Sequence, residues 1–232
     1  MTDEERLIQF AQSTYLMRYG RYIDDIDEPD GQEEVDKTID WANQIIDEIE
    51  PEADWQYVRD NDREIGIVTT PTQTLVLPDS VRKLAVDEER PLAIIQDGAI
   101  VSLWDVVSPD QLTRPNAGFR DKRVTFVDNR VVFSRPFNDT EMNGSIVADV
   151  INYIPRLARD DISVLDILKP IQLLKLGVAK NATLPDIVQG GLSPSFTQKY
   201  GDLLEKAIME NNRSAAANNV VRDDYSSIGG VY

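Results

Sequence analysis

The sequence contains neither cysteine nor histidine among its 232 residues. Without cysteine the chain has no disulfides, thiolate metal sites or cysteine nucleophile. Histidine is the commonest general base and metal ligand near neutral pH, so most enzyme classes lose their best candidate. The chain also lacks a glycine-rich phosphate loop, a Walker lysine and a Gly-x-Ser-x-Gly elbow. We therefore expect a protein that is not an enzyme and that uses no cofactor or metal.

Long hydrophobic runs are also missing. The longest apolar runs fall well short of the roughly 18 residues that a membrane-spanning helix needs. The first residues, Met-Thr-Asp-Glu-Glu-Arg, are acidic where a signal peptide is basic. The content of 41% hydrophobic and 28% charged residues is typical of a globular protein. We expect a cytoplasmic chain without a membrane partner, folded as one large domain or two small ones.

The net charge of −17 is unevenly distributed. Residues 1–62 contain 19 acidic and 5 basic residues, whereas the remaining residues contain 22 acidic and 19 basic ones. Affinity for nucleic acid comes mainly from lysine and arginine, so this pattern argues against a protein that grips duplex DNA. The acidic segment is either a solvated face that keeps the protein soluble or a surface that must not adhere to DNA.

The first 62 residues predict two helices. Thr2 and Glu5 have the spacing of a capping box, and the helix that follows ends at Gly20. A second helix is predicted over about residues 32–49, before Pro51. Its apolar stripe has the helical spacing of three and four residues. The stripe consists of Val35, Ile39, Ala42, Ile46 and Ile49.

The link between these helices resembles a calcium-binding loop only superficially. Its acidic residues are Asp24, Asp25, Asp27, Glu28 and Asp30. Pro29 stands where a third ligand is needed, and no glutamate follows at the closing position of an EF-hand. We therefore do not predict a metal site here.

Residues 63–157 have the pattern of a β domain. Asp97-Gly98 and Asp128-Asn129 each separate two apolar strands and predict hairpins. A last strand ends at Tyr153, before Pro155. The expected fold class is α+β, in which an antiparallel β-sandwich or barrel is inserted into a helical bundle formed by residues 1–62 and 158–219.

Three further helices are predicted after the β domain, the first of which begins near Ser163. Ser163 and Asp166 have the spacing of a capping box. Pro170 suits the first position of a helix that is apolar on nearly every side over residues 171–179, so we expect that helix to be surrounded by others. A last helix begins near Pro194, and its apolar stripe fades after Met209.

The final segment, residues 220–232, is predicted to be an extended C-terminal arm. It is too short to bury itself, yet it is rich in apolar and aromatic residues. These are Val220, Val221, Tyr225, Ile228, Val231 and Tyr232. The segment is either a frayed end or a peptide that becomes ordered on a partner, for example by adding a strand to it.

The order of these features resembles the head-to-tail adaptor proteins of tailed bacteriophages, and most closely their tail tubular protein A type. The features are two acidic helices, the pair Trp55 and Tyr57, the segments Thr69-Thr70 and Leu75–Asp79, the β-rich middle, the strand ending in Tyr-Ile-Pro, the apolar helix, the last helix and the loose tail. The β-rich middle is longer than in the minimal connectors of that family, which leaves its partners open.

The resemblance implies a structural virion protein of the phage neck, present in host cytoplasm during assembly. About a dozen copies would form a dodecamer-like homo-oligomeric ring below the portal protein and above a tail or neck protein. DNA would pass through the ring without specific binding. The segment that contacts the portal would be residues 220–232, with the six apolar and aromatic residues named above.

Two other functions remain open from the residues alone. An acidic DNA mimic that binds a basic protein would explain the charge but not the β domain. A metal-dependent hydrolase that uses Asp24, Asp25 and Asp27 would explain neither the tail nor the missing histidine.

Overall fold

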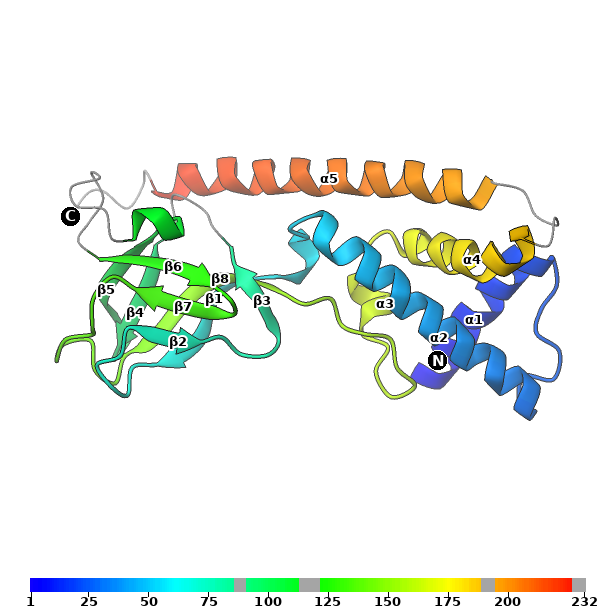
Figure 1. Ribbon diagram of the computed structural model, residues 1–232, viewed down its shortest axis with the longest axis horizontal. Coiled ribbons are helices and arrows are strands. Elements are labelled where there is room, and N and C mark those ends of the chain that lie inside the picture. The colour runs from blue at the N-terminus through cyan, green and yellow to red at the C-terminus, as the bar shows by residue number, and fades with distance from the viewer. Residues whose placement is uncertain (86–90, 113–121, 189–194, 227–232) are drawn as a thin grey trace. The chain divides into compact units, whose positions relative to one another are not determined.

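A computed structural model describes residues 1–85, 91–112, 122–188 and 195–226. The chain has a mixed α/β fold and divides into two compact units (Figure 1). The helical unit consists of Met1–Tyr57 and Ile154–Tyr232, and the β unit consists of Val58–Tyr153. The boundaries lie five and four residues before those expected from the sequence, at 62/63 and 157/158, because the first strand begins at Arg59 and the last strand ends at Asn152.

Five α-helices lie in the helical unit within the described residues. They are α1 (Asp3–Tyr19), α2 (Pro29–Ile49), α3 (Val164–Ile167), α4 (Ile171–Val188) and α5 (Ser195–Ser226). Short 3-10 turns follow α2, over Glu50–Glu52 and Gln56–Val58. The apolar helix α4 packs against α1, α2 and α5, which confirms the prediction that it is surrounded (Figure 1).

Both ends of α1 follow the sequence signals. The Thr2 hydroxyl accepts a hydrogen bond from the Glu5 N–H at 3.2 Å, and the Glu5 carboxylate accepts one from the Thr2 N–H at 2.7 Å. Gly20 ends the helix in the left-handed conformation, with φ of 68°. The predicted capping box is therefore confirmed, and glycine suits Gly20 because it has no Cβ to strain this conformation.

A close approach of two helices depends on Gly177 in α4. A Cβ atom at this position would lie 2.7 Å from two side-chain carbons of Ile45 in α2. Ile45 is completely buried, so the contact lies inside the core of the helical unit. Glycine therefore lets α2 and α4 approach more closely than any larger residue would allow.

The β unit is one curled sheet that forms an open half-barrel. Its strands are β1 (Arg59–Ile67), β2 (Thr74–Val76), β3 (Val81–Leu84), β4 (Leu92–Gln96), β5 (Ala99–Val106), β6 (Arg123–Val127), β7 (Arg130–Phe133) and β8 (Ser145–Asn152). The strand order is β1-β8-β4-β5-β6-β7-β2. The short strand β3 lies outside this order and pairs with the C-terminal part of β8, on the edge of β8 whose N-terminal part pairs with β4. The ladders are antiparallel except for β5 and β6, which are parallel.

Two tight turns fix the hairpins of this sheet. Asp97 and Gly98 join β4 to β5 with φ of 52° and 78°, and Asp128 and Asn129 join β6 to β7 with φ of 48° and 60°. Two successive residues with positive φ are typical of the turns whose twist matches that of the strands. Both predicted hairpins are therefore confirmed.

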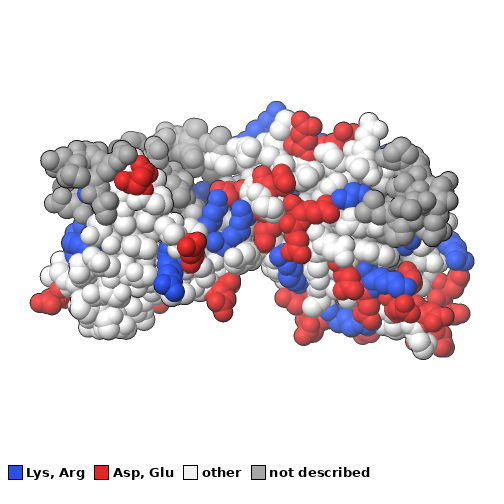
Figure 2. All heavy atoms as spheres, in the orientation of Figure 1, with Lys and Arg blue, Asp and Glu red and all other residues white. Residues whose placement is uncertain are grey.

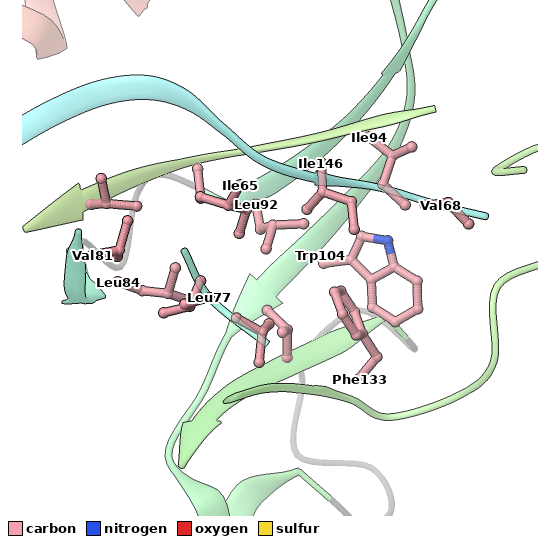
Figure 3. Packing of buried hydrophobic residues seen from close by; sticks show 14 of the residues in the cluster. Ile65, Val68, Leu77, Val81, Leu84, Leu92, Ile94, Trp104, Phe133 and Ile146 are labelled. Atoms are coloured by element: carbon pink, nitrogen blue, oxygen red, sulfur yellow. The ribbon is translucent and has the colours of Figure 1, made fainter. Parts of the chain in front are cut away.

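The core of the β unit lies on the inner face of the curled sheet (Figure 3). Trp104 on β5 is completely buried and meets Phe133 on β7 edge to face, with ring centroids 5.0 Å apart. Phe137 completes this aromatic group at 4.6 Å from Phe133. Leu75 on β2 lies against Gly66 on β1, so the two outermost strands approach each other through a side chain.

Three expectations differ from the structure. One sheet with a parallel pair takes the place of the expected antiparallel sandwich or barrel. Ser163 does not cap α3 with its side chain; its N–H donates instead to the Asp161 carboxylate at 2.9 Å. Residues 220–226 continue α5 and are helical rather than extended, because no glycine or proline interrupts the chain between Gly201 and Gly229.

Within the described residues, no helix combines the length and the apolar character that crossing a membrane requires.

Candidate interaction surfaces

Polar side chains join the two parts of the chain that build the helical unit through buried and half-buried hydrogen bonds. The side-chain amide of Asn43 on α2 accepts a hydrogen bond from the Leu157 N–H at 2.8 Å and donates one to the Leu157 carbonyl at 3.0 Å. The Glu50 carboxylate accepts the Ile154 N–H at 2.7 Å. Asn211 on α5 accepts the Gln56 N–H at 2.7 Å. These contacts hold the segments that precede and follow the inserted β unit.

Basic residues from the second half of the chain neutralise part of the acidic face of α2. Arg159 pairs with Asp36 at 2.8 Å, and Arg156 pairs with Asp47 at 2.7 Å. Lys180 on α4 pairs with Glu48 at 2.6 Å. The sequence places these acids and bases more than a hundred residues apart, so the charge count alone overstates how negative this face is.

The connection between α1 and α2 remains strongly acidic. Asp25, Asp27, Glu28 and Asp30 have no ion-pair partner among the described residues. The connection borders an open cleft of about 710 Å³, which Arg21 and Lys37 also line. Figure 2 shows how acidic side chains gather on the helical unit. This connection therefore carries four carboxylates within six residues that no described cation neutralises.

The acidic connection is anchored by its backbone. A Cβ atom at Gly31, in the first turn of α2, would lie 2.6 Å from the Asp25 carbonyl oxygen and 2.7 Å from the Ile26 Cα. Only glycine therefore permits this contact. The described residues contain no cluster of three or more His, Cys, Asp or Glu side chains arranged to hold a metal ion.

The predicted pair Trp55 and Tyr57 lies beside α5. Their rings stack with centroids 5.4 Å apart, and the Trp55 indole N–H donates to the Ile49 carbonyl at 2.9 Å. Burial raises the pKa of the Tyr57 phenol, and the nearby Glu50 carboxylate raises it further. A cleft of about 240 Å³ adjoins this pair and is also lined by Lys169. Trp55 is almost completely buried, so the stacked pair is part of the packing of the helical unit.

The β unit contains a buried ionic cluster that the sequence did not reveal. Glu141 is completely buried and accepts hydrogen bonds from Arg135 at 2.9 and 3.0 Å, from the Ser102 hydroxyl at 2.7 Å and from the Asn138 N–H at 2.9 Å. The Lys122 ammonium lies 3.1 Å away. Burial alone would raise the pKa of Glu141, but these donors outweigh it and lower the pKa from 4.5 to about 2.

This cluster has a structural role. Glu141 receives all its partners from within the β unit, and the Arg135 guanidinium lies over the ring of Trp104 at 4.8 Å from its centroid. The cluster thereby fastens the connection between β7 and β8 to the core. We therefore assign this cluster a part in the stability of the β unit.

The predicted portal-binding residues fall into two groups. Val220, Val221 and Tyr225 lie within α5, whose backbone is described to Ser226. Ile228, Val231 and Tyr232 lie outside the described residues.

No protein-family model and no curated protein matches this chain.

Proposed function

We propose that this chain is a structural virion protein, the head-to-tail adaptor of a tailed bacteriophage neck. In this proposal it assembles as a dodecamer-like ring below the portal, extends the DNA channel and provides the platform for the tail. It would occur in host cytoplasm during assembly and in the virion neck afterwards. The role requires no catalytic group or cofactor.

The observation that carries the proposal is the arrangement of the chain. A β unit interrupts a helical unit that both ends of the chain build, and the chain then ends in the 32-residue helix α5. The same order of parts underlies the resemblance to adaptor proteins of the tail tubular protein A type, in which a β domain is inserted into a helix bundle. Such an adaptor works by docking to its neighbours, and long helices and inserted units offer several separate docking surfaces.

The acidic connection between α1 and α2 also supports the proposal. Carboxylates repel phosphates over about one Debye length, roughly 8 Å at physiological salt. Asp25, Asp27, Glu28 and Asp30 would therefore discourage DNA from adhering to this surface, yet would not act across a wide channel. Because part of the α2 face is neutralised by Arg156, we assign this role to the connection rather than to all of α2.

The helical state of residues 220–226 changes the expected mode of partner binding. The sequence suggested a segment that adds a strand to its partner. A helix instead docks into a groove by residues three or four positions apart, the spacing of Val221 and Tyr225. We therefore propose that α5 enters a groove of the portal as a helix, followed by residues 227–232.

A binding experiment with a portal protein tests the proposal. The full chain is mixed with purified portal rings of tailed phages, and complexes are counted by electron microscopy and sedimentation. We expect rings of this chain below the portal, and at least a tenfold loss of binding on deletion of residues 220–232 or in the variant Val221→Asp/Tyr225→Asp. Asn219→Asp adds a negative charge in the same segment and serves as the matched control.

The outcomes separate the two candidate functions. If the chain binds no portal and the deletion changes nothing, the adaptor proposal fails. The alternative is an acidic protein that mimics DNA and binds a basic partner through the connection between α1 and α2. It predicts salt-sensitive binding to basic proteins that is lost when Asp25, Asp27 and Asp30 are changed to asparagine, and that does not depend on residues 220–232.

A further inference from the structure

The outer face of the β unit carries apolar side chains that no described strand of that unit covers. Residues that pair directly in antiparallel strands have their side chains on the same face of the sheet. The inner row across β1, β8, β4 and β5 is Gly66, Ile146, Ile94 and Ser102, of which the last three are buried. The next rows on the opposite face are therefore outer rows.

These outer rows form the isoleucine patch, which consists of Ile67, Ala93, Ile95, Ile100, Leu103 and Val147. Ile67 is 51% exposed and Ile100 is 62% exposed. Exposing large apolar side chains to water is unfavourable in free energy, and a cluster of them on the surface of a monomer marks an interaction site.

A smaller surface lies on the other half of the sheet. Val76 on β2 and Val127 on β6 both pair with Arg130 on β7, so the three side chains share one outer row, which we call the valine patch. Val76 is 59% exposed and Val127 is 38% exposed. Arg130 has no ion-pair partner among the described residues.

Charge distinguishes the two patches. Glu64 pairs with Val147 and borders the isoleucine patch, and Asp97 lies in the turn at its other margin. Two isoleucine patches placed face to face would bring these carboxylates together. The valine patch instead offers the Arg130 guanidinium, with Asp128 in the adjoining turn outside its row. Opposite charges thus favour contact between unlike patches.

We infer that the isoleucine patch of one copy docks on the valine patch of a second copy of this chain. A contact between two different surfaces can repeat from copy to copy, and the copies form a closed ring when the rotation between neighbours divides a full turn evenly. The inference thus deepens the proposed function, on which it rests, by naming a surface that joins neighbouring copies.

The area of the patches sets the expected strength. With a strand spacing of about 4.8 Å and a repeat of about 7 Å along a strand, the isoleucine patch, two rows across four strands, covers about 300 Å². The valine patch, one row across three strands, covers about 100 Å². A stable interface needs about 800 Å² from each partner. Two copies in solution should therefore associate weakly through these patches alone, whereas a closed ring adds further contacts and raises the effective concentration.

Crosslinking of single-cysteine variants tests the pairing, and the chain has no native cysteine to interfere. Ile100→Cys and isotope-labelled Val76→Cys are mixed at high concentration and treated with a short thiol-specific crosslinker. Mass spectrometry then separates mixed pairs from self pairs. We expect mixed pairs to exceed Ile100→Cys self pairs at least fivefold. Met209→Cys on α5 is similarly exposed, at 48%, and gives the background level.

A charge exchange provides the second test. Glu64→Arg alone and Arg130→Glu alone should each lower the yield of mixed pairs, and the double variant should restore it. Mixed pairs at the background level would overturn the inference, as would an excess of Ile100→Cys self pairs or a double variant that stays impaired. Portal binding is not involved, so crosslinks without portal binding would contradict the proposed function and leave this inference standing.

Discussion

Glu141 shows how one buried side chain couples the β unit to pH. Its carboxylate is fully buried, but Arg135 meets both of its oxygens and Lys122 lies close by. A buried carboxylate is tolerated only when such donors replace water, and removal of one partner of a buried ion pair costs several kcal/mol. Glutamine in its place would leave the two cations without their counter-charge.

We therefore predict that the β unit loses stability in acid through this residue. The pKa of Glu141 is lowered in the folded chain, from 4.5 to about 2, so the ionised form stabilises the fold. This contribution is complete above pH 4.5 and is lost as the pH falls from there towards about 2. Urea unfolding followed by tryptophan fluorescence should show this loss, and Glu141→Gln should be less stable by about 2–3 kcal/mol at neutral pH.

The control for this prediction is Glu64→Gln, which removes an exposed carboxylate from the same unit. It should leave both the stability and its pH dependence nearly unchanged. If Glu141→Gln loses as much stability as the wild type between pH 4.5 and 2, then the acid sensitivity arises from other groups.

Individual residues were predicted from the sequence where a local rule governs them. Thr2, Gly20 and Gly98 follow from cap and turn chemistry, which depends on a few neighbouring residues. Glu141 gave no such signal because its partners, Ser102 and Lys122, come from other parts of the chain. The burial of Ile45 was missed for the same reason, since it depends on Gly177 in a distant helix.

At the scale of elements, the contact between α2 and α4 can be tested with two glycines. In Gly177→Ala the new methyl group would meet Ile45, so we predict a loss of about 1–3 kcal/mol from overpacking. A methyl group at Gly201 on α5 would meet no atom within 4 Å beyond the adjoining backbone of its own helix. Gly201→Ala should therefore stabilise the chain by about 0.5–1 kcal/mol. Chemical unfolding followed by circular dichroism at the helix band measures both changes.

The two variants control each other, because each replaces a helical glycine by alanine. If Gly177→Ala proves as stable as Gly201→Ala, the α2–α4 distance can adjust freely and the proposed close approach is wrong.

The elements that were predicted correctly have a clear period or a strong boundary. The hairpins of β4–β5 and β6–β7 and the surrounded helix α4 belong to this group. The stripe of α2 was correct except at Ile39, which is half-buried while the neighbouring Thr38 is buried. The parallel pairing of β5 with β6 was not predictable, since 16 residues separate these strands and no local pattern selects a partner. The length of α5 was underestimated because its apolar stripe fades, although helix-forming residues continue.

The candidate surfaces were less predictable than the elements. The acidity of residues 24–30 is visible in the sequence, but the pairing of α2 acids with Arg156, Arg159 and Lys180 depends on the tertiary fold. The isoleucine patch was also hidden, because the strand pattern does not show which apolar face is covered until the pairing of the strands is known.

For the whole molecule, the two units have separate cores, and we predict separate unfolding transitions. Trp41 and Trp55 lie in the helical unit, whereas Trp104 lies in the β unit. A chain with Trp41→Phe/Trp55→Phe should report the β unit by fluorescence, and Trp104→Phe should report the helical unit. Glu141→Gln should lower the unfolding midpoint of the β unit only, and Gly177→Ala should lower that of the helical unit only. Coincident shifts in both probes would instead indicate one cooperative structure.

The close contact of Gly31 with the Asp25–Ile26 backbone has a consequence for the binding of dissolved ions. Carboxylates bind a divalent cation tightly when they can converge on it. A backbone that is fixed at this point hinders such convergence, and the described side chains form no group that could enclose a metal. The uncompensated carboxylates of this connection are expected to attract dissolved cations as a diffuse atmosphere, which added salt screens within about one Debye length.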